Sequence, residues 1–199
     1  DYWNKLRTQA QGNELPDVFW MNGPNIQLYA ANGMLAPIDK ITGAGVKWSN
    51  YPKALVDLYT FEGKHYGVPK DFDTIGVFYN KKIFKEAGVE APTAGWTWDD
   101  FHDKAKKISD WGKSKGIYGC ATTINGDGQD TYYNTIAQAG GYVIKDHASG
   151  FGDPKSIEGL QCWADWVKDG SVASPKVVTD TKPSQMFTSG KSAMFWTGD

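Results

Sequence analysis

The chain has 199 residues, 40% of them hydrophobic, which is enough to build a core in one large domain or in two small lobes. Its formal net charge of −2 at pH 7 lacks the basic excess that phosphate backbones or anionic lipids attract, so we expect no nucleic acid or membrane surface as a partner. Aromatic residues make up 14% of the chain, and their flat apolar faces with polar edges suit sugar and peptide sites.

Residues 1–80 predict short helices that alternate with short apolar strands. The spacing of Trp3, Leu6 and Ala10 is helical, and Gly12 stands where that helix would stop. The elements expected here are a helix over 2–12, a strand over 16–20, a helix over 25–32, a short helix over 53–59 and a turn leading into a strand over 61–69. The apolar run over 75–78 then predicts a strand covered on both faces.

Beyond Asn80 the pattern changes to longer helices. Thr97 followed by Asp100 is a helix-capping pair, and Asp153 before Pro154 begins the clearest helix of the chain. The elements expected here are helices over 81–87, 98–108, 131–139, 154–167 and 185–189, with strands over 116–122 and 192–196. This alternation of strands and helices predicts α/β architecture in two lobes.

The stretch from Asp71 to Lys81 combines two carboxylates with an apolar strand that ends in Tyr79 and Asn80. Side chains alternate in extended backbone, so Asp71 and Asp73 would face the same side and address one ligand. Polar groups at the end of a buried strand are where α/β proteins place binding sites. The alternative interpretation is that both aspartates are solvated turn residues before the strand.

Several signatures of catalysis and metal binding fail on spacing. The run Gly190-Lys191-Ser192 lacks the earlier glycine of a phosphate-binding loop. The loop 125–130 lacks the glycine and the terminal glutamate of a calcium loop, so we expect a polar surface or cleft loop. The three histidines form no helical metal pair, and Cys120 and Cys162 belong to no zinc or redox motif. We therefore expect no metal.

Asp71 and Asp73 admit a second hypothesis, a carbohydrate-active hydrolase in which they act as acid and nucleophile. Glycoside hydrolysis needs two carboxyl groups that flank the scissile bond. Residues two apart in the sequence give no evidence of such opposed placement. We therefore expect that the protein is not an enzyme, with hydrolysis as the alternative.

The aromatic side chains divide into core and rim candidates. Core packing is the ordinary role of the tryptophans in predicted helices, which are Trp3, Trp98, Trp163 and Trp166. The turn after a predicted strand forms a candidate ligand rim of four residues, Trp20, Met21, Asn22 and Asn25. Trp196 ends the last strand in a similar position, and Tyr133 begins a helix after a polar loop. Each of these rim candidates has core packing as its alternative role.

A series of short motifs runs through the chain in a fixed order. In the first part they are Pro16-Asp17-Val18-Phe19-Trp20, Tyr29-Ala30, Gly33-Met34-Leu35-Ala36-Pro37-Ile38, Gly67-Val68-Pro69, Asp73 and Phe78-Tyr79-Asn80-Lys81. They continue with Phe84, Ala87-Gly88, Pro92, Thr97-Trp98-Asp99-Asp100-Phe101, Gly140-Gly141 and Phe187-Thr188-Ser189-Gly190-Lys191-Ser192-Ala193-Met194. Each motif is weak alone, but in this order they are specific. The chain resembles the extracellular solute-binding proteins of family 1, the maltose-binding-protein-like receptors of ABC sugar importers.

The resemblance implies a two-lobed periplasmic-binding-protein-like α/β fold with a hinge and a central cleft. Residues 1–79 would form a partial N-terminal lobe and residues 80–199 an incomplete C-terminal lobe, with the hinge crossing near Tyr79–Lys81. The family's N-terminal strand and C-terminal portion are missing from this sequence, so we expect a fragment whose first lobe lacks strands.

The same resemblance implies a monomeric extracytoplasmic receptor, either periplasmic or held at the cell surface as a lipoprotein. It would capture a carbohydrate, in particular an oligosaccharide, and deliver it to the permease subunits of an ABC transporter. Lobe closure is a hinge motion, so no covalent step and no cofactor are required. A receptor of the same fold for a non-sugar solute is the remaining alternative.

The family pattern, together with the candidate rim, places ligand contacts in both lobes. The expected ligand residues are Trp20, Met21, Asn22, Asn25, Asp71, Asp73, Gln129, Asp130, Tyr133, Trp196 and Thr197. Carboxylates and amides would form hydrogen bonds with sugar hydroxyls, while the Trp and Tyr faces would stack on the sugar ring. Among the acids, Asp73 is the principal candidate and Asp71 a helper.

Overall fold

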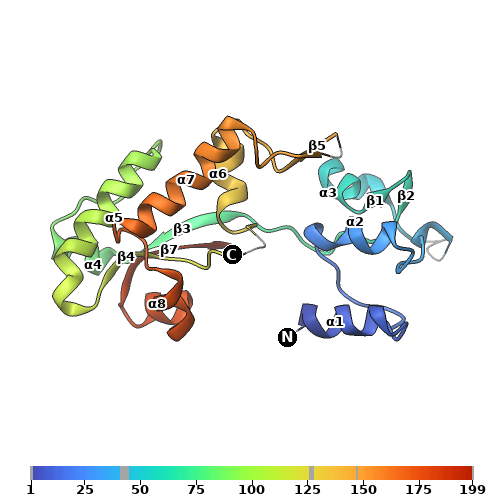
Figure 1. The fold of residues 1–199 in the computed structure, drawn as a ribbon, viewed down its shortest axis with the longest axis horizontal. Coiled ribbons are helices and arrows are strands. Elements are labelled where there is room, and N and C mark those ends of the chain that lie inside the picture. The colour runs from blue at the N-terminus through green and yellow to red at the C-terminus, as the bar shows by residue number, and fades with distance from the viewer. Residues whose placement is uncertain (1, 41–44, 126–127, 147, 199) are drawn as a thin grey trace. The chain divides into compact units, whose positions relative to one another are not determined.

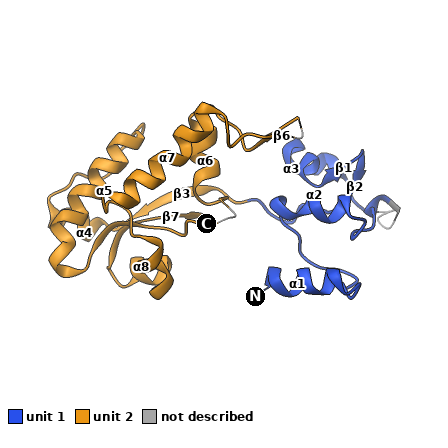
Figure 2. Ribbon diagram, viewed as in Figure 1, with its two compact units in different colours: residues 1–72 blue, residues 73–199 orange. Residues whose placement is uncertain are grey.

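The computed structural model describes residues 2–40, 45–125, 128–146 and 148–198, which belong to two compact units, 1–72 and 73–199 (Figure 1, Figure 2). The division lies between Phe72 and Asp73, ahead of the boundary expected at residues 79–80. The reason is that strand β3 (Ile75–Tyr79) is paired into the sheet of the second unit. A hinge near Tyr79–Lys81 stays a prediction.

The first unit consists of short helices and a two-stranded ribbon. Its elements are α1 (Tyr2–Gln11), α2 (Gly23–Ala31), 3-10 turns η1 (Ile38–Lys40) and η2 (Trp48–Asn50), α3 (Lys53–Leu58), β1 (Thr60–Phe61) and β2 (Lys64–His65). The strands pair antiparallel, and Glu62 and Gly63 between them have positive φ, as a two-residue hairpin turn requires. Leu6, Ala10 and Tyr29 form the core cluster of this unit.

The strand expected over 16–20 is wrong. These residues have irregular backbone, and Val18 is 89% exposed. The turn expected at the start of 61–69 is confirmed by the β1–β2 ribbon, but no strand continues beyond His65. A strand is held by hydrogen bonds to a neighbouring strand, and the described part of this unit supplies no partner beyond β1 and β2.

The second unit is a three-stranded sheet between helices. Its strands are β3, β4 (Tyr118–Ala121) and β7 (Ser192–Gly198), with a separate two-stranded ribbon of β5 (Ile144–Lys145) and β6 (Ala148–Ser149). Its helices are α4 (Lys81–Ala87), α5 (Trp98–Gly112), the 3-10 turn η3 (Lys113–Lys115), α6 (Tyr132–Gln138), α7 (Pro154–Lys168), α8 (Pro175–Asp180) and α9 (Pro183–Thr188). The sheet order is β3-β7-β4, in which β7 runs antiparallel to β3 and parallel to β4.

Helices cover both faces of this sheet. On one face α5 and α7 pack Phe101, Trp163 and Trp166 against Met194 and Trp196 of β7. The opposite face carries α8 (Figure 1), and side chains of α8 and α9 pack there in a smaller cluster around β4. No helix within the described ranges is both long enough and apolar enough to cross a membrane.

Local signals predicted the helix ends well. The Thr97 hydroxyl accepts the backbone N–H of Asp100, whose carboxylate accepts the backbone N–H of Thr97, so the predicted capping pair is confirmed. Asp153 caps α7 as expected. The strand over 75–78 is also confirmed, but its burial on both faces is wrong. Burial alternates along β3 and Phe78 is 46% exposed, so only one face of this strand is covered.

Candidate ligand-binding site

The parallel strands of the second unit bring distant segments of the sequence to one edge. Ala121 of β4 lies opposite Phe195 of β7, and an isolated parallel bridge joins Cys120 to Val172 just before α8. The residues that follow β4, β7 and Val172 therefore lie at the same side of the unit. The crevice outside the carboxyl ends of strands is the usual ligand position in α/β proteins.

A pocket of about 390 Å³ lies at this edge, and we call it the carboxyl-end pocket. It is lined by Thr122, Thr123, Asp130, Val178, Thr179, Lys182, Pro183, Ser184, Phe195, Trp196 and Thr197. Three of these residues, Asp130, Trp196 and Thr197, were predicted as ligand contacts. The structure therefore brings together a predicted loop residue and the predicted end of the last strand.

The floor of the carboxyl-end pocket is held by a buried hydrogen bond. The hydroxyl of Thr122 donates to the carbonyl oxygen of Trp196 over 2.7 Å and ties the end of β4 to the end of β7. Hydroxyl groups dominate the rest of the polar lining. The charged residues are Asp130 and Lys182, which have opposite signs, so the lining has no net formal charge. Such a lining suits a neutral, hydroxyl-rich ligand.

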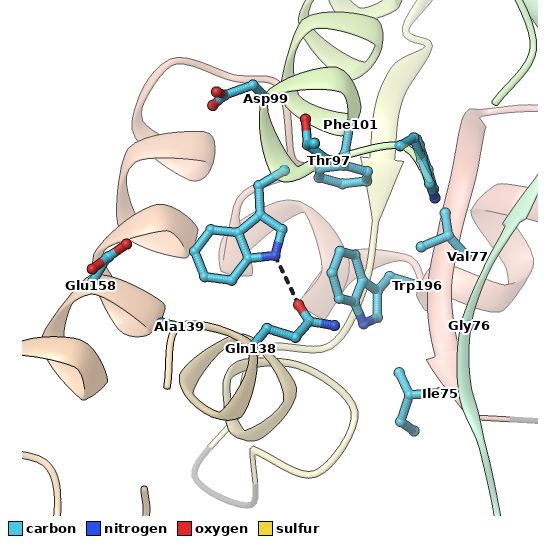
Figure 3. A pocket seen from close by; sticks show the side chains of 12 residues that line it. Ile75, Gly76, Val77, Thr97, Asp99, Phe101, Gln138, Ala139, Glu158 and Trp196 are labelled. Carbon is cyan, nitrogen blue, oxygen red and sulfur yellow. Dashed lines mark hydrogen bonds between the residues drawn. The ribbon is translucent and has the colours of Figure 1, made fainter. Parts of the chain in front are cut away.

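A second cavity of about 780 Å³, which we call the aromatic cavity, lies among β3, α5, α6 and α7 (Figure 3). It is lined by Ile75, Gly76, Val77, Trp96, Thr97, Trp98, Asp99, Phe101, Gln138, Ala139, Glu158 and Trp196. The indole N–H of Trp98 donates to Oε1 of Gln138 over 2.8 Å across it. Trp196 lines both cavities and is the residue that they share.

Trp196 is packed inside an aromatic cluster. Its ring centroid lies 4.9 Å from that of Trp163 and 5.3 Å from that of Phe101, both in edge-to-face contact, and only 7% of the residue is exposed. These contacts occupy the ring, so the expected stacking of a sugar on its face finds no support in this packing. The indole N–H has no hydrogen-bond partner within the described residues.

Other predicted residues of the second unit are distributed around this edge. Asp73 lies directly beside Gly198, where an added Cβ would overlap the Asp73 carboxylate. The backbone carbonyl of Gln129 accepts a hydrogen bond from the Asn134 amide over 2.6 Å, and the half-buried Tyr133 contacts Tyr132 edge to face. None of these residues lines either of the two cavities. Residues 126 and 127 of the predicted polar loop lie outside the described residues.

The first unit gathers its own predicted residues around an exposed tryptophan. Trp20 is 66% exposed, and the Lys70 ammonium lies 4.0 Å from its ring centroid. Lys70 also forms an ion pair with Asp71, so Trp20 and Asp71 meet through one cation. Burial, followed by the nearby Asp71 charge, raises the pKa of Tyr59, whose hydroxyl donates to the Met21 carbonyl over 3.2 Å.

The rest of the predicted rim is ordered by its own amides. Nδ2 of Asn25 donates to Oδ1 of Asn22 over 2.7 Å at the start of α2. The structure thus pairs Trp20 with Asp71 and Asn22 with Asn25 inside the first unit. Sequence reasoning missed Lys70 as the link between the first pair, although its position directly before Asp71 was a readable signal.

Sequence reasoning also missed most of the carboxyl-end pocket. Thr122 and Thr123 directly follow β4, and the corner from Val178 to Ser184 joins α8 to α9. These positions follow from the parallel register of β4 and β7, which no local spacing reveals. A readable signal for α8 was Ser174 before Pro175, a helix-capping pattern that the structure uses.

The described residues contain neither a candidate metal cluster nor a cysteine with a lowered pKa. No group of His, Cys, Asp and Glu there could hold a metal ion. Burial raises the pKa of Cys120 to about 12 and that of Cys162 to about 11, so both are neutral thiols at ordinary pH. Asp71 belongs to the first unit and Asp73 to the second, and the hydrolase hypothesis stays an alternative.

Comparison with known proteins identifies the kind of protein that has this structure. The diacetylchitobiose binding protein of Streptomyces coelicolor is 28% identical over 203 residues, which cover 97% of this chain and 45% of that protein. A maltotriose-binding protein of Pyrococcus abyssi is 29% identical over 164 residues, covering 81% of this chain and 33% of that protein. An ABC substrate-binding protein from Listeria monocytogenes, solved in complex with cycloalternan, matches with a TM-score of 0.87 and 30% identity.

The Listeria structure is matched over 100% of this chain and 51% of its own. This likeness confirms the predicted periplasmic-binding-protein-like α/β fold. The chain spans about half the length of the Listeria protein and less than half the length of the two sequence relatives. The family model described as bacterial extracellular solute-binding protein matches residues 1–199, and the chain therefore belongs to the family of bacterial extracellular solute-binding proteins.

Proposed function

We propose that this chain belongs to an extracytoplasmic receptor that captures a carbohydrate, in particular an oligosaccharide. The observation that carries the proposal is the carboxyl-end pocket, in which the predicted residues Asp130, Trp196 and Thr197 meet at the ends of parallel strands. The relatives give independent support. Two are named for binding diacetylchitobiose and maltotriose, and the third was solved with cycloalternan, and all three ligands are oligosaccharides.

The chemistry of the pocket suits sugar recognition. The Asp130 carboxylate accepts hydrogen bonds from sugar hydroxyls, and the Lys182 ammonium donates to sugar oxygens. Thr123, Thr179 and Thr197 carry hydroxyls that both donate and accept, as the hydroxyls of a sugar do. The ligand is held without covalent chemistry, so the protein acts by binding and not by catalysis.

Trp20 supplies the aromatic platform of the first unit in this proposal. Its ring is largely solvent-exposed, and Lys70 and Asp71 beside it provide one donor and one acceptor. Aromatic faces bind the apolar C–H surface of sugar rings, while polar groups at the ring edge bind the hydroxyls. As the family resemblance implies, the proposal includes ligand capture in an interlobe cleft and a hinge near Tyr79–Lys81.

The proposal extends to partners and location. The receptor is monomeric, acts outside the cytoplasm and hands its ligand to the permease subunits of an ABC transporter, with a lipid anchor as one mode of retention. The family match to extracellular solute-binding proteins supports the location.

Calorimetry with the protein tests the proposal. Maltotriose, N,N′-diacetylchitobiose and cycloalternan serve as sugar probes, with sn-glycerol 3-phosphate and a tripeptide as non-sugar solutes. We expect saturable heat with at least one of the sugars. Heat from a non-sugar solute, combined with none from any sugar, would replace the carbohydrate assignment with a non-sugar receptor. Release of shorter sugar products during the titration would instead favour the hydrolase.

A further inference from the structure

The indole N–H of Trp196 is a buried donor that has no partner in the part of the chain that the structure describes. The residue is 93% buried, and its N–H meets no acceptor within the described residues. A buried donor without an acceptor is costly, and native proteins rarely keep one without a use. Trp163 beside it shows the ordinary solution, because its N–H donates to the Thr135 hydroxyl over 3.0 Å.

The unpaired N–H lies at the wall of the aromatic cavity. Figure 3 shows the nitrogen of Trp196 on the edge of the ring turned toward Gln138 and Ile75, which line the same cavity. The rest of the ring packs against Trp163 and Phe101. Trp196 therefore offers a polar edge to the cavity while its ring stays packed against the aromatic cluster.

Gln138 presents a second donor to the same cavity. The indole N–H of Trp98 can only donate, so it requires the amide oxygen of Gln138 on its side, and the structure has Oε1 there at 2.8 Å. The amide NH2 group is then turned the other way, toward Trp196 in Figure 3. Two donor groups thus face the cavity, and a bound group that satisfies them must carry acceptor oxygens.

The charges around the cavity decide what kind of acceptor fits. Asp99 and Glu158 also line it, and their carboxylates repel an anionic ligand. A neutral oxygen, such as a sugar hydroxyl or an acetamido carbonyl, accepts from both donors without that repulsion. The indole of Trp98 supplies an apolar surface for the C–H groups of a sugar ring.

We infer, on the basis of the proposed function, that the aromatic cavity is a second sugar subsite in which Trp196 and Gln138 donate hydrogen bonds to neutral oxygens of the ligand. Trp196 recognises the sugar through its N–H edge and not through its face. The subsite is separate from the carboxyl-end pocket, with Trp196 as their common wall.

A matched pair of tryptophan variants tests this inference. Trp196→Phe keeps an aromatic ring in the cluster but removes the unpaired N–H. Trp163→Phe makes the same chemical change at a neighbouring position whose N–H is already paired with Thr135. Calorimetry uses whichever of maltotriose, N,N′-diacetylchitobiose and cycloalternan binds the unaltered protein most tightly. We expect Trp196→Phe to weaken binding about fivefold to tenfold and Trp163→Phe to leave the affinity within twofold.

Gln138→Glu provides a second variant at an exposed side chain. The carboxylate still accepts from Trp98 but no longer donates to the ligand, so we expect a loss of affinity of similar size. Unaltered affinity in both Trp196→Phe and Gln138→Glu, with sugar binding by the parent protein intact, would overturn the subsite alone and assign the Trp196 N–H to water. Absence of sugar binding by the parent protein would overturn the proposed function and the subsite with it.

Discussion

The hydroxyl of Thr122 donates a 2.7 Å hydrogen bond to the carbonyl oxygen of Trp196, and this contact fastens the ends of two parallel strands that are far apart in the sequence. Thr122 is only 1% exposed, so the bond is shielded from water. Hydrogen bonds of this kind cost most when one partner is removed, because the other is left buried and unpaired. We therefore expect the position of Trp196 at both cavities to depend on Thr122.

Thr122→Val tests this dependence with a side chain of nearly the same shape. We expect the variant to lose about 1–3 kcal/mol of unfolding free energy in urea denaturation, since the Trp196 carbonyl is left without its side-chain donor. Thr188→Val is the control, because the Thr188 hydroxyl bonds to the Ser184 carbonyl on an exposed helix surface. A loss in Thr122→Val no larger than in this control would show that the strand ends are held by other contacts.

Lys182 is expected to contribute affinity and not stability. Its side chain is exposed and makes no hydrogen bond or ion pair within the described residues, but it lines the carboxyl-end pocket. Lys182→Ala should therefore weaken sugar binding roughly threefold to tenfold in calorimetry, by the loss of one charge-assisted hydrogen bond. Lys176→Ala on the neighbouring helix α8 makes the same charge change outside the pocket. Equal affinities of the two variants would remove Lys182 from the site.

Asp73 is the principal predicted acid, and a substitution at Gly198 can displace its carboxylate without replacing Asp73 itself. A Cβ at position 198 would overlap the Asp73 carboxylate, which must rotate away because the clash falls on the end of a flexible side chain. We expect Gly198→Ala to lower sugar affinity as much as Asp73→Asn does. Gly152→Ala is the control, since a Cβ there meets nothing within 4 Å. Wild-type affinity in both Gly198→Ala and Asp73→Asn would exclude Asp73 as a ligand residue.

The sequence predicts most local structure because the signals for helix ends are local. Asn80 accepts from the backbone N–H groups of Lys82 and Ile83, and Gly88 adopts the left-handed conformation after α4, as their residue types indicate. Strands are less predictable, since residues 16–20 have a suitable apolar pattern but no neighbouring strand to pair with in the described chain. Pattern alone does not supply the partner.

The candidate site was likewise predictable where the signal was local and not where it depends on packing between distant segments. Trp196 was predictable as a rim candidate because it ends a strand, whereas Asp130 and Thr197 were indicated by the family resemblance. Lys182 was not, because it reaches the pocket through the α8–α9 corner and the parallel bridge at Val172. The role of Trp196 was misread for a related reason. Its burial by Trp163 and Phe101 depends on how α5 and α7 pack on β7, which no pattern along one strand contains.

The α5 cap should respond to acid in a defined direction. Hydrogen bonds from the Thr97 backbone N–H and then from its hydroxyl lower the pKa of Asp100 below 3.8. A carboxylate with a lowered pKa stabilises the folded state at pH values above 3.8, and that contribution is lost as the pH falls through the folded-state pKa. Carboxyl-carbon NMR titration should therefore find the Asp100 midpoint below 3.8, and Thr97→Val should raise it.

Asp39 is the internal reference in the same titration. Its pKa is lowered by hydrogen bonds from the backbone N–H and the ring of His65. Both residues belong to the first unit, whereas Asp100 belongs to the second. Thr97→Val should leave the Asp39 midpoint where it was. An Asp100 midpoint that does not move in the variant would assign the lowered pKa to the Thr97 backbone alone.

Trp20 should separate ligand affinity from stability in the first unit. Its ring is 66% exposed and contacts the Lys70 ammonium, so Trp20→Ala removes little buried surface and should change the unfolding free energy by less than about 0.5 kcal/mol. If Trp20 is the sugar platform, the same variant weakens sugar binding about tenfold. Trp111→Ala is the matched control, because Lys115 lies 3.4 Å from the ring centroid of Trp111, which belongs to α5 and lines neither cavity. We expect Trp111→Ala to cost more stability than Trp20→Ala, since Trp111 packs partly against the core, while its sugar affinity stays at the wild-type value. Wild-type affinity in Trp20→Ala would remove Trp20 from the site.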